Sequence, residues 1–249
     1  MGFSIPLNHC LHKVELTYNK PSMSDDKITV KTRFLAKQIC NVLIRYYGKA
    51  VSARKLAPLD ELVMTILSQH TNDTNMFRAY EALKERFPTW EEVLNASQDE
   101  VALFIKSSGM YNLKAKRIQA TLREINERVG RLDLSLLETM EVDKAKKWLT
   151  SLHGVGPKTA AIVLLFSFER PVLPVDTHVW RVTKRLGLID EKVTREKAHV
   201  LLEEIMPQSC IPSLNKNLVR HGREVCKALN PNCDECFLSH LCKYYKSLK

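Results

Sequence analysis

The sequence predicts an all-α fold built from short helices. Apolar residues recur at three- and four-residue spacings through most of the chain, as on the buried face of a helix. No stretch shows the sustained alternation of apolar and polar residues that marks a half-exposed strand. Glycines such as Gly48, Gly109 and Gly187 stand where the helical patterns stop, as expected at helix C-termini. These observations together place the chain in the all-α class.

The apolar patterns also order the helices along the chain. Pro58 and Asp60 open the second helix, a polar patch at residues 68–73 ends it, and the third stops before Pro88. A long basic amphipathic helix follows Gly109. The expected helices cover about residues 32–48, 58–67, 76–87, 90–94, 101–109, 113–129, 145–152, 157–168, 179–187, 196–205 and 214–229.

The chain is basic and of ordinary apolar content. Its 249 residues can bury the core of one large domain or of two small ones. The formal net charge of +10 favours a polyanionic partner and says nothing about the fold. The N-terminus lacks a basic region followed by an apolar stretch, so we expect an intracellular protein of the cytoplasm or nucleoid. The longest apolar run, around residues 160–168, is too short to cross a bilayer, so we expect no membrane partner.

A turn of small residues lies between two of the expected helices. Gly154, Val155 and Gly156 let backbone N–H groups approach a ligand without obstruction by Cβ atoms. Pro157 suits the first position of the helix that follows. Such a helix N-terminus binds phosphate through its backbone amides. The pattern is typical of a helix-hairpin-helix turn that contacts DNA, and a plain corner between two helices is the alternative.

Lys158 and Asp176 are the candidate catalytic residues. Lys158 lies in the first turn of the helix after the hairpin, where the helix dipole disfavours an ammonium ion. A free amine is what a Schiff-base nucleophile requires, whereas a charged lysine here would only contact phosphate. Asp176 precedes an expected helix and suits its N-cap position. Its ionised carboxylate can also stabilise positive charge on a sugar or relay a proton.

Four of the seven cysteines lie close together near the C-terminus. Six, two and five residues separate them, so only one Cys-x-x-Cys pair is present where a zinc ribbon would normally have two. Four thiolates on one short loop suit either zinc or a [4Fe–4S] cluster, and without a secretion signal a metal site is favoured over disulfides. These candidate ligands are Cys226, Cys233, Cys236 and Cys242.

The other three cysteines stand far apart in the sequence. Cys10, Cys40 and Cys210 have no cysteine neighbour, and we expect each of them to be an isolated thiol.

Taken together, these motifs resemble the endonuclease III branch of the helix-hairpin-helix DNA glycosylases. LHGVGPKTA (152–160) resembles the hairpin of that family, VDTHVWRV (175–182) its catalytic-aspartate motif, and the 6-2-5 cysteine spacing its [4Fe–4S] loop. SGMYNLKAKRI (108–118) and HGREVC (221–226) are similar to two further segments. The resemblance runs in the right order from about residue 31 to residue 245.

The resemblance implies a base-excision repair enzyme that removes oxidised pyrimidines from damaged duplex DNA and cleaves the backbone by β-elimination. It assigns Lys158 as the nucleophile at C1′, Asp176 as its catalytic partner and a [4Fe–4S] cluster as the cofactor, with zinc less favoured. The enzyme is expected to act as a monomer. A mismatch-directed or 8-oxoguanine-directed glycosylase of the same superfamily is the nearest alternative. A non-catalytic iron–sulfur DNA-binding module is the alternative from another class.

The resemblance also implies an organisation into two helical domains. Residues 58–170 would form a six-helix domain that carries the hairpin. Residues 31–57 and 171–249 would form the cluster domain. Residues 1–30 lack a clear helical period, so the sequence itself predicts a flexible lead-in there. DNA would lie in a cleft between the two domains.

Two loop residues are expected to enter the duplex. An enzyme of this kind must extrude its target base, and an apolar wedge and a polar plug offset the lost stacking. Met110 falls where the family inserts its wedge, although a methionine buried in the core is the alternative reading. His70, in the segment LSQHTND (67–73), falls where a glutamine usually plugs the duplex, so this chain departs from the family there.

Overall fold

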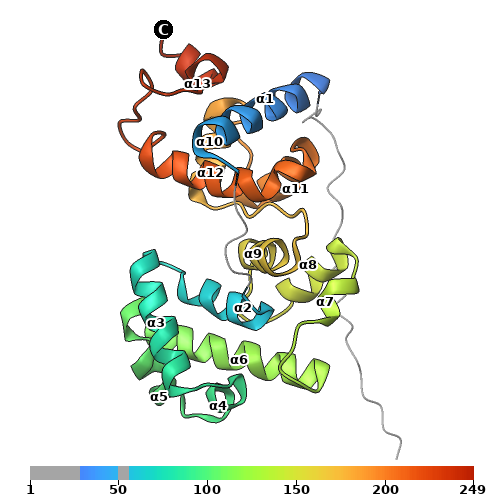
Figure 1. Cartoon of the computed structure of the whole chain (residues 1–249), viewed down its shortest axis with the longest axis vertical. Coiled ribbons are helices and arrows are strands. Elements are labelled where there is room, and N and C mark those ends of the chain that lie inside the picture. The colour runs from blue at the N-terminus through green and yellow to red at the C-terminus, as the bar shows by residue number, and fades with distance from the viewer. Residues whose placement is uncertain (1–28, 50–55) are drawn as a thin grey trace, which may run out of the picture.

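The computed structural model describes residues 29–49 and 56–249, which fold entirely into helices and loops, without strands (Figure 1). The all-α prediction is therefore confirmed. The helices are α1 (Val30–Tyr47), α2 (Pro58–Leu67), α3 (Asp73–Arg86), α4 (Trp90–Asn95), α5 (Gln98–Phe104), η1 (Lys106–Ser108), α6 (Tyr111–Val129), α7 (Leu136–Thr139), α8 (Val142–Thr150), α9 (Pro157–Phe168), α10 (Thr177–Leu186), α11 (Arg195–Ile205), η2 (Gln208–Cys210), α12 (Ile211–Glu224), η3 (Ser239–Leu241) and α13 (Lys243–Lys246).

Most helix ends lie within a few residues of their expected positions, because the capping residues are those that the sequence indicates. Thr29, Asn72 and Asp176 each accept a hydrogen bond from the backbone amide three residues ahead. The last long helix is the main exception. We expected it to reach residue 229, but α12 ends at Glu224, and the amide of Cys226 turns back to the carbonyl of His221.

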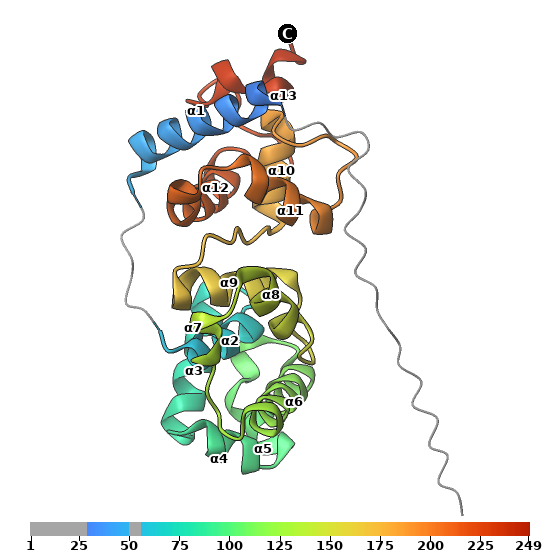
Figure 2. The same ribbon diagram turned by 90° about the vertical axis from the view of Figure 1, so that its right-hand side faces the viewer.

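The described residues bury two separate hydrophobic cores. One joins apolar side chains from Leu59 to Val172, and the other joins α1 to Leu165 and to side chains from Leu173 to Cys242. Figures 1 and 2 show the two corresponding bodies one above the other, and we call them the hairpin lobe and the cysteine lobe. Residues 58–168 hold eight α-helices, of which six are seven residues or longer.

Helix α9 contributes to both cores. It lies on the side of the hairpin lobe that faces the cysteine lobe (Figures 1 and 2). Leu164 packs in the core of the hairpin lobe, whereas its neighbour Leu165 packs in the core of the cysteine lobe. Burial on both sides explains why this helix is apolar around its whole circumference.

The extended connector that follows α9 is held by side chains of the cysteine lobe. Glu203 accepts a hydrogen bond from the Leu173 amide at 3.0 Å, and His199 Nδ1 lies 3.2 Å from the Leu173 carbonyl oxygen. Asn215 Nδ2 donates to the carbonyl of Pro174 at 2.8 Å. The chain therefore reaches Asp176 along a path fixed by three buried or half-buried polar side chains.

The expectation of isolated thiols is wrong for two cysteines. Cys40 on α1 and Cys210 in η2 form a disulfide with a Cα–Cα distance of 6.5 Å. They are 170 residues apart in the sequence, and only the packing of α1 against the start of α12 brings them together. Cys10 and residues 1–28 of the expected flexible segment lie outside the described residues. The last two residues of that segment, Thr29 and Val30, are the N-cap and the first residue of α1. Among the described helices, none combines the length and the apolar character needed to span a membrane.

Candidate active site

The hairpin turn joins α8 to α9, and its two glycines have different structural roles. Gly154 has a φ of +79°, in the left-handed region that favours glycine, and a Cβ here would lie 3.2 Å from the side chain of Arg117. Gly156 has an ordinary φ of −93°, and a Cβ would meet nothing within 4 Å. The fold therefore requires glycine at 154. At 156 the absent side chain leaves room for an approaching ligand.

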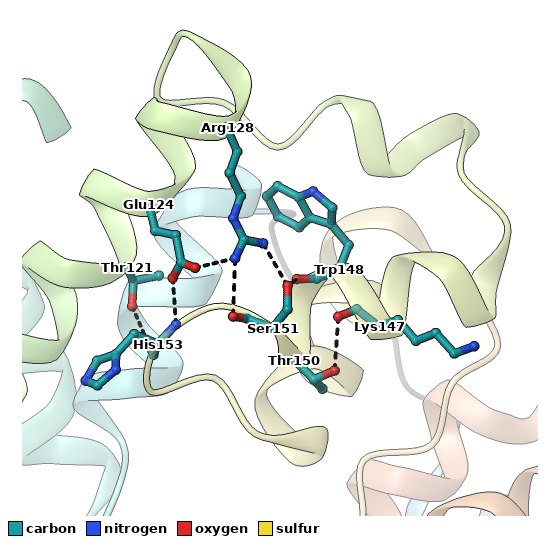
Figure 3. Close-up of polar contacts among 8 residues, drawn as sticks. All are labelled: Thr121, Glu124, Arg128, Lys147, Trp148, Thr150, Ser151 and His153. Atoms are coloured by element: carbon teal, nitrogen blue, oxygen red, sulfur yellow. Dashed lines mark hydrogen bonds and ion pairs between the residues drawn. The ribbon is translucent and has the colours of Figure 1, made fainter. Parts of the chain in front are cut away.

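Helix α6 fixes the position of the turn (Figure 3). Thr121 donates to the carbonyl of His153 at 2.8 Å, and Glu124 accepts from the amide of His153 at 2.8 Å. Arg128 pairs with Glu124 and donates to the Ser151 hydroxyl at 2.7 Å. Val155 is buried at the centre of the turn. Both polar groups of the His153 backbone are thus anchored to a neighbouring helix, and the hairpin is presented as a rigid element.

Lys158 follows Pro157 at the start of α9, and its side chain is exposed. Gly156, the N-cap residue, provides no side chain to cap the helix. The first amides of α9 are therefore left to solvent or to a ligand, which is the arrangement that binds phosphate. An exposed amine at this position is accessible to a sugar whose phosphate is held by the turn.

Asp176 is the N-cap of α10, as its sequence context predicts. Its Oδ1 accepts a hydrogen bond from the Val179 amide at 2.8 Å, and the side chain is half-buried. Among the ion pairs of the described residues, none joins Asp176 to Lys158. The two side chains stand at the N-termini of α9 and α10, so the whole of α9 and the connector after it separate them along the chain.

His70 and Met110 occupy two exposed turns of the hairpin lobe. Met110 is 51% exposed, which excludes the reading of a core methionine. Both residues have left-handed backbones, with φ of 54° for His70 and 48° for Met110. Non-glycine residues in this region are strained, and such strain clusters at functional sites.

The four clustered cysteines line a single cavity near the C-terminus. All four sulfurs are free of disulfide bonds. Burial raises the pKa of Cys236 to about 11, and it also raises the pKa values of Cys233 and Cys242. Such thiols need a cation to become thiolates, and a bound metal supplies one. Among the described residues, no three His, Cys, Asp or Glu side chains surround one single-ion position. The four cysteines are among the residues that line the cavity.

Three further side chains support the cysteines. His221 is fully buried, with Nε2 3.6 Å from the sulfur of Cys236 and Nδ1 3.3 Å from the hydroxyl of Tyr47. Burial lowers the pKa of His221 to about 4, so the ring is neutral and has one N–H to donate. Arg185 Nη1 lies 3.4 Å from the sulfur of Cys226. Sequence reasoning did not assign Tyr47 or Arg185, because each approaches the loop from a distant helix.

Comparisons with known proteins identify the superfamily of the chain. A profile described as "HhH-GPD superfamily base excision DNA repair protein" matches residues 63–208. The chain belongs to that superfamily. A second profile, described as "Iron-sulfur binding domain of endonuclease III", matches residues 226–242, the segment bounded by Cys226 and Cys242. The cofactor of the cysteine loop is accordingly an iron–sulfur group.

Relatives in both sequence and structure include endonuclease III proteins. Endonuclease III of Thermotoga maritima is 39% identical over 190 residues, which cover 76% of this chain and 84% of that protein. A solved structure of a non-covalent endonuclease III–DNA complex has a TM-score of 0.74 at 26% identity and covers 87% of this chain. The structure of a trapped endonuclease III–DNA covalent intermediate has a TM-score of 0.73 at 27% identity and also covers 87% of this chain. The chain is thus an endonuclease III-like enzyme of the DNA glycosylase/AP lyase class.

Proposed function

We propose that the chain is a bifunctional glycosylase that removes oxidised pyrimidines from duplex DNA and then cleaves the abasic strand through a lysine Schiff base. The single observation that carries the proposal is Lys158, an exposed amine directly after a turn whose backbone suits phosphate. Glycosylases that activate only water have no need of an amine at this position. The substrate is double-stranded DNA, and the enzyme acts on it as a monomer.

In the proposed mechanism Lys158 attacks the sugar of the extruded nucleotide. Its Nζ forms a bond to C1′ while the bond from C1′ to the base breaks, and the base leaves with the electron pair. The carboxylate of Asp176 stabilises the positive charge that develops on the sugar and accepts the proton lost by the amine. The hydrogen bond from the Val179 amide fixes the position of that carboxylate at the start of α10.

The second half of the reaction cleaves the strand. The C1′–O4′ bond breaks, O4′ takes a proton, and C1′ and Nζ become doubly bonded as a Schiff base. This electron-withdrawing iminium makes the C2′ hydrogen acidic. Removal of that proton forms a C2′–C3′ double bond and expels the 3′ phosphate with the electron pair of the C3′–O bond.

Borohydride trapping tests the proposal. Wild-type protein mixed with abasic duplex and borohydride should form a covalent protein–DNA adduct, because the reductant fixes the Schiff base. Lys158→Ala should form none, whereas Lys144→Ala, which removes an exposed lysine of α8, should match wild type. Absence of an adduct with wild type would contradict the lyase mechanism and would leave a glycosylase that activates only water or a non-catalytic DNA-binding module. Equal adduct with Lys158→Ala would assign the chemistry to another amine.

Lesion choice needs its own assay. A panel of duplexes with oxidised pyrimidines, 8-oxoguanine or mismatched thymine should show fastest base release from the oxidised pyrimidines, scored separately from strand cleavage. Faster release from 8-oxoguanine or from mismatches would replace the oxidised-pyrimidine assignment by one of the two alternatives within the superfamily.

We further propose that the cysteine loop holds a [4Fe–4S] cluster. Four cysteines that line one cavity fit such a cluster, which is held by four thiolates. When bound, its iron core would stabilise the thiolate charges, and the cluster would cross-link the loop. Arg185 and His221 would then donate hydrogen bonds to its sulfur ligands. Purified protein should absorb near ~400 nm and contain about four irons. Stoichiometric zinc in a colourless protein would contradict this.

A further inference from the structure

A fully buried lysine lies at the base of the two loops that carry His70 and Met110. Lys114 on α6 is 1% exposed. Its ammonium donates to the carbonyl of Leu67 at 2.7 Å and to the carbonyl of Ser108 at 2.6 Å. A buried ammonium is costly unless it is well hydrogen-bonded, whereas a methionine would fill the same space without that cost. The lysine is therefore explained by the two carbonyls that it binds.

The two carbonyls mark the starts of the two loops. Leu67 is the last residue of α2, and residues 68–72, which we call the plug loop, follow it with His70 near their middle. Ser108 ends η1 and begins residues 108–110, the wedge loop, which includes Met110. One ammonium thus joins the two points from which both loops depart.

Other contacts brace the same pair of loops. Arg117, one turn further along α6, donates to Gln69 of the plug loop at 2.9 Å. The hydroxyl of Ser107 donates to the carbonyl of Asn75 at 3.1 Å and so connects η1 to α3. These contacts are partly exposed, and only the Lys114 contacts are fully buried.

Burial lowers the pKa of Lys114 to about 8, so the side chain is still mostly charged near neutral pH. No Asp or Glu pairs with this ammonium among its hydrogen bonds, and its partners are both backbone oxygens. The positive charge strengthens both hydrogen bonds, and it holds the end of α2 against the end of η1.

We propose that Lys114 is a positioning residue that fixes the spacing between the plug loop and the wedge loop, so that both enter the duplex together when the target base is extruded. The inference rests on the proposed function, because it gives His70 and Met110 their roles. Two insertions that must fit one gap in the duplex tolerate little relative movement, and misplacement by about an ångström is enough to slow a reaction ~100-fold. Lys114 itself touches neither base nor sugar.

The test compares two DNA substrates that differ in the cost of extrusion. One holds an oxidised pyrimidine paired with its partner base, and in the other the same lesion faces a stable abasic analogue, so no pairing has to be broken. Single-turnover base release by Lys114→Met should fall at least ~10-fold on the paired substrate. On the unpaired substrate, the fold decrease in the rate of base release should be at most about a third of the decrease on the paired substrate. Lys114→Arg, which keeps the charge and the donors, should recover most of the rate.

Control measurements separate this inference from the proposed function and from simple misfolding. Lys116→Met removes an exposed lysine of the same helix and should affect both substrates equally. An equal loss on both substrates with Lys114→Met would overturn the inference. Wild-type protein that releases no base from either substrate would instead overturn the proposed function.

A measurement on the wild-type protein covers the case in which Lys114→Met does not fold. The amides of Gln69 and Thr71 in the plug loop, and those of Gly109 and Lys114 beside the wedge, are all hydrogen-bonded to backbone carbonyls. In native-state hydrogen exchange the two pairs should open as one unit with the same opening free energy. Independent opening of the two loops would overturn the inference.

Discussion

The ammonium of Lys146 on α8 bonds to the Glu203 carboxylate on α11 and thereby joins the two lobes. The other carboxylate oxygen of Glu203 accepts the amide of Leu173 in the connector. Burial raises the pKa of Glu203, and the pairing with Lys146 opposes that shift. A carboxylate that is only 17% exposed therefore depends on this lysine for its charge partner.

Removing Lys146 should destabilise the protein more than its surface position suggests. Lys146→Met leaves the Glu203 charge partly buried and unpaired, and we expect it to lower the free energy of unfolding by about 2 kcal/mol at pH 7.5. Lys144→Met on the exposed face of the same helix should change it by less than ~0.5 kcal/mol. Urea unfolding measures the free energy of unfolding of both variants. Similar values for the two would show that the ion pair between the lobes contributes nothing to stability.

The disulfide between Cys40 and Cys210 should make stability depend on redox conditions. It closes a loop of 170 residues, and the chain-entropy argument gives it up to about 5 kcal/mol of stabilisation. Oxidised protein should melt at a higher temperature than protein treated with a reductant, and Cys40→Ser should melt like the reduced form under both conditions. Peptide mapping without reduction should recover the peptides of Cys40 and Cys210 linked. Finding both as free thiols in oxidised protein would contradict the bond.

His199 should make the connector sensitive to acid. Burial lowers the pKa of His199 to about 4, against an unfolded value near 6.5. Between these values the unfolded chain binds the extra proton, so stability is fully present above about pH 6.5 and is lost as the pH falls towards 4. Between pH 7 and pH 5, protonation of this residue in the unfolded chain should lower the free energy of unfolding by about 2 kcal/mol.

Urea unfolding of wild type and His199→Gln at the two pH values isolates that contribution. The comparison is needed because other buried groups titrate in the same range, such as Glu61, whose pKa burial raises to about 7. The variant should lose about 2 kcal/mol less than wild type on acidification. If wild type and His199→Gln lost the same free energy of unfolding on acidification, His199 would have to be protonated in the folded protein as well.

Asp176→Asn should separate catalysis from folding. Asparagine caps a helix as well as aspartate does, so the hydrogen bond from the Val179 amide survives and the melting temperature should barely change. The carboxylate charge is lost, and base release should slow at least ~100-fold, the usual cost of one electrostatic stabiliser. Affinity for abasic duplex should stay within about threefold of wild type. Strongly weakened binding would show that Asp176 serves mainly as a structural cap.

The two hairpin glycines offer a matched pair of substitutions. Gly154→Ala forces a Cβ into the left-handed region and against Arg117, so it should lower the free energy of unfolding by about 1–2 kcal/mol. Gly156→Ala meets no neighbour and should leave stability within ~0.5 kcal/mol of wild type. It should nevertheless weaken DNA binding, because its Cβ occupies the space left for phosphate. Unchanged binding by Gly156→Ala would remove this turn from the DNA interface.

The sequence predicted features that depend on neighbouring residues, and it did not predict contacts between residues that are far apart in the chain. Periodicity and caps gave the helices, including the N-cap at Asp176, because these signals lie within a few residues of one another. The cysteine loop was visible for the same reason. The Cys40–Cys210 bond was not, since its halves are 170 residues apart. Lys114 looked like one more charge on a basic helix, and only the packing of α6 against α2 and η1 shows it to be buried.

The helix that begins with Pro157 and Lys158 belongs to both halves of the protein. With Leu164 in one core and Leu165 in the other, α9 cannot be assigned to a single exchangeable module. A chimera that replaced residues 173–249 with the matching part of a relative would have to preserve the apolar side chains that surround Leu165 as well as the four cysteines. When relatives are aligned, the side-chain volume at position 165 should therefore vary together with the volumes of the residues that pack against it in the cysteine lobe. A chimera of two relatives should fold only where these volumes match.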